Sequence, residues 1–308
     1  MPETKAKYLF LNGLYLPYED AKIHVLTPAA KYGATVYEGI RGYWVDSEDQ
    51  LYLFRLDDHI RRLFQSMEMT WMEPPYSFDE FKQHIVGIIK KNEFRQDIHI
   101  RIMVFVLSDD GAMISMTPIG AAIAALPMGR ISEKSEKGLS CAVSSWRRIS
   151  DNSTPPRIKC SGNYQNSRLA GIQVHLDGYD NVIILNENGK VSEGAGSNIF
   201  IVRNSIPITP PVTSNILEGI TRDTLIRLFL EKHGLQTIER EIDRSELYVA
   251  EEVFYCGSAS EVVPIISVDR HKISDGNAGS LTRAIKKSYM NLVRGIESDH
   301  NDWRTPVY

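Results

Sequence analysis

The sequence predicts an α+β protein with two domains, and three observations lead to this fold class. Two near-continuous apolar runs, Ile98–Leu107 and Ala121–Leu126, are typical of buried strands. Ser77 and Glu80 form a capping-box pattern, which predicts that a helix begins there. A polar, charged stretch bounded by a proline and a glycine then separates these elements from the rest of the chain.

That stretch, residues 127–138, is the best candidate for an interdomain linker. We therefore expect a small N-terminal α/β domain over residues 1–126, with a sheet covered on one side by two helices. A larger C-terminal domain is expected over residues 139–308. A chain of 308 residues is long enough for two domains that each have a core of their own.

In the first domain, Asn12-Gly13 is a hairpin signal, and two segments have apolar residues at helical spacing. Asp57 or Asp58 can cap the first helix, which is expected to end near Met69, and the second is expected to end near Lys91. The expected strands are Tyr8–Leu11, Leu14–Leu16, Lys22–Leu26, Arg41–Val45, Leu51–Phe54, Ile98–Leu107 and Ala121–Leu126.

In the second domain, Gly178 and Gly234 end two helices, and the proline-rich segment Pro207–Pro211 predicts a loop. The expected strands are Ser140–Ser145, Val182–Leu185, Ile199–Val202, Val253–Tyr255 and Val262–Ile266. The expected helices run from about Tyr164 to His175, from Gly219 to Lys232, over Ser245–Ala250 and over Leu281–Val293.

Composition excludes several classes of function. The net charge of −4 and the lack of a Lys/Arg run give no footprint for nucleic acid or for an acidic membrane surface. No apolar run approaches the ~18 residues that a membrane span needs, and the N-terminus lacks the pattern of a signal peptide. Three widely spaced cysteines, Cys141, Cys160 and Cys256, fit a reducing compartment. We expect a cytoplasmic protein.

Known ligand motifs are incomplete. The segment that begins at Gly194 (GAGSNI) lacks the third glycine of a dinucleotide fingerprint, and the chain has no Walker sequence. It also has no H-E-x-x-H pattern, so we expect no metal site.

Two residues point to carbonyl chemistry. Lys159 lies between Ile158 and Cys160, where a loss of hydration favours the neutral amine that attacks a carbonyl to form a Schiff base. Glu193 follows an apolar strand and lies in a glycine-rich turn, where its carboxylate could hold a pyridine nitrogen protonated. An isolated lysine of this kind more often extends its amine into water, so the pair alone does not decide the function.

The motifs around these residues resemble those of the class IV (fold type IV) aminotransferases, and among them the branched-chain amino acid type. The resemblance covers about residues 8–295 in one order. Its motifs are VYEGIRGY (Val36–Tyr43), RLDDHIRRL (Arg55–Leu63), IKCSGNY (Ile158–Tyr164), SEGAGSNIF (Ser192–Phe200), LEGITRDTL (Leu217–Leu225) and EVFYCGSASEVVPI (Glu252–Ile265). It implies a pyridoxal phosphate (PLP) enzyme whose second domain is a β-rich pseudo-barrel.

The resemblance also implies roles for single residues. Lys159 would be the catalytic residue that binds PLP covalently and then moves the proton between the substrate and the cofactor. The remaining cofactor-binding residues would be Glu193 at the ring nitrogen, Tyr164 at the phenolic oxygen, and Arg62, Gly219, Ile220, Thr221 and Ser258 at the phosphate. The phosphate group fits the start of a helix, where free N–H groups favour an anion.

The substrate pocket is expected to take branched-chain or aliphatic L-amino acids and 2-oxoglutarate in turn. Arg101 would meet the second carboxylate of glutamate or 2-oxoglutarate, because an arginine in an apolar strand is costly to bury without an anion. The substrate-binding residues implied by the family are Tyr32, Tyr37, Gly39, Arg41, His99, Arg101, Met128, Ser258 and Ala259.

Some positions depart from the family pattern. His99 stands where a tyrosine is expected, Met128 where a tryptophan is expected, and the segment after Val106 is short and acidic. These departures leave two alternatives open. The enzyme could be a transaminase that accepts D-amino acids or (R)-amines, or it could be an enzyme similar to aminodeoxychorismate lyase. A non-enzymatic scaffold is disfavoured by the presence of both Lys159 and Glu193.

The family resemblance also implies an oligomer. We expect a homodimer at least, with a hexamer as an open alternative, in which loops near Tyr32 and Met113 contribute to the neighbouring site.

Overall fold

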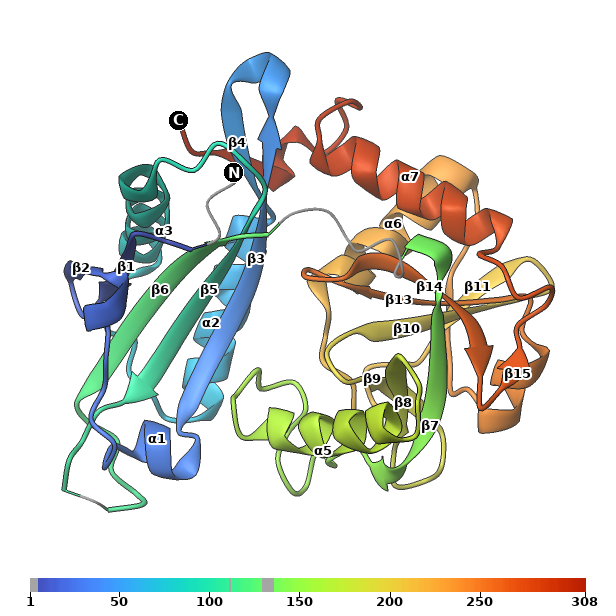
Figure 1. Ribbon diagram of the computed structural model, residues 1–308, viewed down its shortest axis with the longest axis horizontal. Helices are drawn as coiled ribbons and strands as arrows, with labels where there is room; N and C mark the ends of the chain where they lie inside the picture. The colour runs from blue at the N-terminus through green and yellow to red at the C-terminus, as the bar shows by residue number, and fades with distance from the viewer. Residues whose placement is uncertain (1–4, 111, 129–135) are drawn as a thin grey trace. The chain divides into compact units, whose positions relative to one another are not determined.

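The computed structural model describes residues 5–110, 112–128 and 136–308, which fall into two compact units (Figure 1). The first unit contains the described residues of Met1–Arg130, together with Ile158–Gly162 and Leu292–Tyr308. The second contains the described residues of Ile131–Arg157 and Asn163–Asn291. The chain therefore returns to the first unit twice. Most of the linker predicted at residues 127–138 lies outside the described residues.

The first unit is built on a seven-stranded sheet in the order β16-β4-β3-β5-β6-β1-β2. Its strands are β1 (Tyr8–Leu11), β2 (Leu14–Pro17), β3 (Thr35–Val45), β4 (Gln50–Phe54), β5 (Ile98–Val106), β6 (Ile119–Pro127) and β16 (Arg304–Pro306). Its α-helices are α1 (Pro28–Tyr32), α2 (Leu56–Met69) and α3 (Phe78–Asn92), and its 3-10 helices are η1 (Tyr18–Asp20), η2 (Asp46–Glu48) and η4 (Asn301–Trp303).

The second unit is built on a nine-stranded mixed sheet in the order β12-β11-β10-β13-β14-β7-β8-β9, with β15 paired to β14. Its strands are β7 (Leu139–Arg147), β8 (Asn181–Leu185), β9 (Val191–Gly194), β10 (Asn198–Arg203), β11 (Ile206–Thr209), β12 (Ile238–Glu239), β13 (Glu252–Gly257), β14 (Glu261–Val268) and β15 (His271–Lys272). The helices are α5 (Asn163–Leu176), α6 (Ile220–His233), η3 (Arg244–Val249) and α7 (Ser280–Val293), whose last two residues fall in the first unit.

The pleat of β5 gives the first sheet two different faces. Ile98, Ile100 and Ile102 are fully buried in the core cluster, whereas His99 and Arg101 alternate with them and point to the other face. Antiparallel pairing with β3 continues both faces, because Gly39 lies opposite Arg101 and Arg41 opposite His99. One face of the β3–β5 pair is therefore apolar core, and the other gathers polar side chains.

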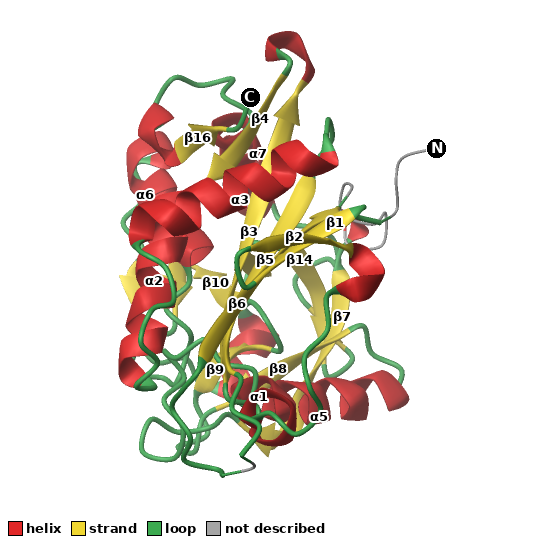
Figure 2. Ribbon diagram, turned by 90° about the vertical axis from the view of Figure 1, so that its left-hand side faces the viewer, coloured by secondary structure: helices red, strands yellow, loops and turns green. Residues whose placement is uncertain are grey.

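Helices α2 and α3 cover the apolar face, as predicted (Figure 2). Ile60, Leu63 and Met67 of α2 and Ile85 of α3 are all fully buried in the same cluster. The capping box at Ser77 is present, since its side chain accepts from the backbone N–H of Glu80 and the Glu80 carboxylate accepts in return. Among the helices of the described residues, none is long and apolar enough to cross a bilayer.

Four local predictions are wrong. Lys22–Leu26 forms no strand; these residues are largely exposed, so they have no partner face to bury. Glu193 lies in strand β9 rather than in a turn. The expected loop at Pro207–Pro211 begins with strand β11. Neither Asp57 nor Asp58 is the N-cap of α2; both lie in its first turn, and Arg55 with a left-handed backbone precedes them.

The C-terminal segment is part of the first unit's core. Strand β16 pairs antiparallel with β4, and the backbone N–H of Arg55 donates to the carbonyl of Trp303 at 2.7 Å. The Trp303 ring is 9% exposed, lies 6.2 Å from the Phe54 ring and carries the Arg55 guanidinium 4.5 Å above it. This anchor holds the last residues on the first sheet.

Trp303→Ala should therefore destabilise the protein by about 3–5 kcal/mol, the usual cost of truncating a buried aromatic side chain. Chemical denaturation measures this as a drop in the free energy of unfolding. The matched control is Trp71→Ala, which removes a ring that is 80% exposed and should change stability little. Equal effects for the two variants would contradict the anchoring role.

Candidate active site

The polar face of the β3–β5 pair collects five of the predicted substrate residues. Tyr37, Gly39 and Arg41 on β3 alternate with core residues, and His99 and Arg101 lie opposite them on β5. Arg101 is exposed, and its guanidinium carbon lies 5.4 Å from the centre of the Tyr37 ring. Arg101 is therefore not buried, so its burial gives no reason to expect an anion beside it. Its side chain does face this polar surface.

Gly39 is required by the packing of this face. A Cβ at this position would meet Cε1 of His99 at 2.9 Å and Nε2 at 3.0 Å, which is closer than real Cβ contacts come. The glycine thus lets the His99 ring lie close to the backbone of β3.

His99 is a buried, neutral histidine. It is 7% exposed, and among the described residues no partner lies within hydrogen-bond distance of its Nδ1. Burial, with the positive charges of Arg101 and Arg41 adding to it, lowers the pKa of His99 to about 4. The ring is therefore neutral at physiological pH and presents an unpaired polar atom.

Lys159 lies beside the same strand. Its carbonyl accepts from the backbone N–H of Tyr37 at 2.9 Å, and its backbone N–H donates to the hydroxyl of Ser66 at 3.3 Å. The side chain is half-buried, and Nζ lies 4.9 Å from the centre of the Tyr37 ring. The backbone of β3 thus fixes Lys159 next to the face that carries Arg101.

The Glu38 side chain, on the opposite face of β3, binds Arg62. The fully buried Glu38 carboxylate accepts from Nε of Arg62 at 2.6 Å and from Nη2 at 2.9 Å, and it lies 2.7 Å from Nδ1 of His59. Burial alone would favour the neutral acid, but Arg62 and His59 outweigh it and hold the pKa of Glu38 well below its usual range. Burial lowers the pKa of His59, so this ring is a neutral donor to Glu38.

In the second unit, Glu193 is a buried carboxylate with donors on both of its oxygens. Oε2 accepts from Nδ2 of Asn198 at 3.0 Å and from the backbone N–H of Leu217 at 3.1 Å. Oε1 lies 2.9 Å from Nη2 of Arg148. These contacts satisfy an ionised carboxylate in a site that is only 5% exposed.

The predicted phosphate cradle lies close to Glu193 in the same unit. Asn198 donates to Glu193 and also to the carbonyl of Leu217, and a Cβ at Gly219 would meet Oδ1 of Asn198 at 1.9 Å. Gly219 is the N-cap of α6 and supplies no side-chain cap, while Thr221 is buried inside the first turn. This 14-residue helix therefore begins without a side-chain cap, and the start of a helix favours an anion.

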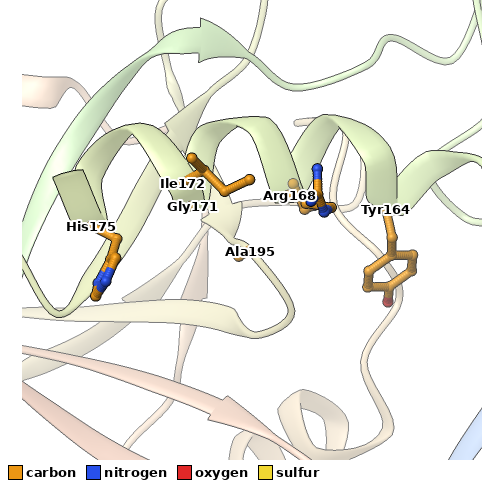
Figure 3. A pocket seen from close by; sticks show the side chains of 7 residues that line it. Tyr164, Arg168, Gly171, Ile172, His175 and Ala195 are labelled. Carbon is orange, nitrogen blue, oxygen red and sulfur yellow. The ribbon is translucent and has the colours of Figure 1, made fainter.

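Tyr164 lies in the first turn of α5 and borders an open hollow of about 530 Å³ (Figure 3). The hollow is lined along the helix by Arg168, Ile172 and His175, and Ala195 also lines it. Ser258 lies just after β13 and is half-buried, and Ala259 beside it is exposed.

Two predicted substrate residues have other contacts. Tyr32 lies at the end of α1, is 46% exposed, and has Nζ of Lys31 4.8 Å above its ring. Met128 contacts another predicted substrate residue through its backbone, since its carbonyl accepts a hydrogen bond from Nη1 of Arg41 at 3.1 Å.

Sequence reasoning missed the residues that hold the predicted ones. Arg148 and Asn198 contact Glu193. Glu38 contacts Arg62, and His59 in turn contacts Glu38. Asn198 and Glu38 stand inside motifs that were recognised, so their proximity in sequence was a usable signal. Arg148 follows strand β7 and is separated from Glu193 by α5 and β8, and no local pattern identifies it.

Comparison with known proteins decides the family. The model of the family described as amino-transferase class IV matches residues 35–268. The chain belongs to the class IV aminotransferases. The predicted family and α+β fold class are confirmed.

Individual relatives match this aminotransferase over its whole length. A probable branched-chain-amino-acid aminotransferase of Aquifex aeolicus is 41% identical over 303 residues, covering 98% of this chain and 97% of its own. The structure of the branched-chain amino acid aminotransferase from Thermobaculum terrenum in its PLP form superposes with a TM-score of 0.92 at 39% identity, covering 99% of this chain and all of that one. The T.th. branched-chain enzyme complexed with N-(5'-phosphopyridoxyl)-L-glutamate has a TM-score of 0.93 at 32% identity, with coverages of 99% and 100%.

The low pKa of His99 predicts an acid-sensitive contribution to stability. In the unfolded chain a histidine takes up its proton near pH 6.5, whereas folded His99 does so only near pH 4. Between these values the unfolded state binds more protons, so stability falls as the pH falls, by about 3 kcal/mol at most. His99→Gln should reduce this fall in the free energy of unfolding between pH 7 and pH 4.

The control for this titration is His24→Gln, which replaces an exposed histidine and should leave the pH dependence as it is. A His99→Gln variant with the full acid sensitivity of the parent would show that His99 is protonated in the folded protein.

Proposed function

We propose that this aminotransferase moves the amino group between branched-chain or other aliphatic L-amino acids and 2-oxoglutarate, with PLP as its cofactor. The observation that carries the proposal is a set of three features in a chain of this family. They are the half-buried Lys159, the buried Glu193 carboxylate with Arg148 beside it, and the start of α6, which has no side-chain cap. The names of the relatives support the substrate class, and the PLP form of the Thermobaculum terrenum enzyme supports the cofactor.

The donor set fits PLP at each of its polar groups. The Glu193 carboxylate matches the ring nitrogen, and the start of α6 at Gly219, Ile220 and Thr221 matches the phosphate. The close approach of Asn198 to Gly219 keeps these two parts of the cradle at a fixed separation. We assign Tyr164 to the phenolic oxygen, and Arg62 and Ser258 to the phosphate, on the family resemblance.

Once bound, PLP supplies an electron sink that stabilises the negative charge left when the α-proton of the amino acid is removed. In our proposal the Lys159 amine anchors the cofactor at rest. Once substrate had displaced it, the same amine would take the proton from Cα of the amino acid and would then give that proton up again. Glu193 holds the proton at the ring nitrogen throughout, because its carboxylate is a fixed anion.

The polar face of β3 and β5 orients the substrate. Arg101 is an exposed cation above the Tyr37 ring, and it suits the second carboxylate of 2-oxoglutarate or glutamate. Tyr37 supplies an aromatic surface for an aliphatic side chain. The phosphopyridoxyl-glutamate complex of the T.th. enzyme supports a site that accepts a dicarboxylate.

Lys159 should carry the cofactor. After borohydride reduction of the protein with bound PLP, peptide mass spectrometry should find the cofactor on Lys159. Lys159→Ala should lose about four or more orders of magnitude in rate, since the anchor and the proton carrier are removed together. The exposed Lys91→Ala is the control and should retain activity. A cofactor trapped on another lysine would refute the assignment.

Arg101 should separate the two half-reactions. A charge-assisted contact to a carboxylate contributes about 1.5–3 kcal/mol, so Arg101→Ala should lower kcat/KM for 2-oxoglutarate by roughly ten- to a hundredfold. The leucine half-reaction, followed in a single turnover by the absorbance of the cofactor, should change far less. Arg95→Ala, which removes an exposed arginine paired with Asp49, is the control. Equal losses in both half-reactions would assign Arg101 to the α-carboxylate or to the fold.

We also propose a cytoplasmic homo-oligomer, a dimer at least. None of the three cysteines forms a disulfide, in keeping with a reducing compartment. In the first unit, Val25, Met113 and Ile114 are 74%, 68% and 83% exposed, and a neighbouring subunit would cover such apolar side chains. Light scattering should give at least twice the mass of 34.9 kDa. An active monomer would contradict this.

A further inference from the structure

In the second unit, an arginine that is far from Glu193 in sequence contacts the Glu193 carboxylate. Nη2 of Arg148 lies 2.9 Å from Oε1 of Glu193, and the two side chains are 4% and 6% exposed. The arginine is itself fixed: its backbone N–H donates to the carbonyl of Leu185 at 2.8 Å, and Nη1 donates to the hydroxyl of Ser167 at 3.3 Å. The ion pair is thus rigid and shielded from water.

Stability does not explain this pair. Burying two opposite charges costs desolvation energy that their attraction repays only when the remaining polar atoms are satisfied. Within the described residues, Nε of Arg148 is buried without a hydrogen-bond partner. An apolar pair of similar volume would serve the fold at least as well, so the charge on Arg148 has another use.

The two donors on the other carboxylate oxygen are neutral. Asn198 contributes an amide and Leu217 a backbone N–H, so Arg148 is the charged member of these three. Burial raises the pKa of the nearby Cys256 thiol to about 12, which keeps it neutral. Burial favours the neutral acid over the carboxylate, and a charged donor such as Arg148 opposes this effect more strongly than a neutral donor does.

We propose that Arg148 is a positioning residue that keeps Glu193 an anion, and thereby keeps the shared proton on the ring nitrogen of PLP instead of on Glu193. The inference rests on the proposed function. Two arrangements compete for one proton: a carboxylate facing a pyridinium, or a carboxylic acid facing a neutral pyridine. Because Arg148 contacts the carboxylate directly, its attraction to that anion exceeds its repulsion of a cation bound beyond it. Arg148 therefore selects the first arrangement.

The first test uses the protein without cofactor. Infrared spectroscopy near neutral pH detects the carbonyl stretch of a protonated carboxyl group. Arg148→Gln should show this band, and the double variant Arg148→Gln/Glu193→Gln should lose it. The parent protein, Arg148→Lys and the neighbouring exposed Arg147→Gln should lack it. Arg147→Gln is the matched control, since it removes the same charge one residue away.

The second test uses the holoenzyme with PLP labelled by ¹⁵N in the ring. The parent and Arg148→Lys should show the chemical shift of a pyridinium, and Arg148→Gln should move towards that of a neutral pyridine. In the same variant kcat for leucine should fall about ten- to a hundredfold, the loss expected when a hydrogen bond to a charged group is removed, while KM changes less.

The outcomes are distinguishable. A folded Arg148→Gln protein with no carboxyl band and an unchanged nitrogen shift would overturn the role of Arg148 alone. A neutral ring nitrogen in the parent holoenzyme would overturn the role proposed for Glu193 itself. If Arg148→Gln does not fold, Arg148→Met replaces it with the same expectations, because its apolar side chain lets Glu193 become neutral.

Discussion

A buried carboxylate needs a positive partner, and both units of this aminotransferase are organised by that constraint. In the first unit Glu38 is fully buried and is held by Arg62 and His59; in the second, Glu193 is held by Arg148. Each pair joins a strand to an element elsewhere in its unit, and each fixes a charged group that the proposed chemistry uses. Loss of one partner would leave an uncompensated charge in a dry site, which is far more costly than loss of a surface ion pair.

Much of the fold could be predicted from local physics. The continuous apolar run that forms β5 and the capping box of α3 depend on neighbouring residues alone, so their limits were found to within one or two positions. The C-terminal strand β16 was not found, because its three residues become a strand only by pairing with β4, about 250 positions earlier. Lys22–Leu26 has the alternation of a strand but no sheet edge to join. Strand β9 was predicted as a turn because Gly194 and the glycine that follows at position 196 are typical of turns, although β9 pairs with β8.

Some residues of the candidate site could likewise be predicted from the sequence, and others could not. Lys159, Glu193 and Gly219 lie in motifs that resemble those of the family, and this resemblance, rather than any single residue type, predicted their roles. Arg148 could not, because a single arginine after a strand has no pattern, and only the fold of the second unit places it against Glu193. The exposure of Arg101 was also unpredictable, since an apolar strand sequence does not reveal which of its faces is left open.

The substrate class is the central claim, and a panel of amino donors tests it most directly. L-leucine, D-alanine and (R)-phenylethylamine would each be assayed with 2-oxoglutarate under one set of conditions, and kcat/KM compared. The account predicts the highest value for L-leucine. A higher value for D-alanine or for the amine would contradict it, and would assign the His99 and Met128 departures to a different substrate.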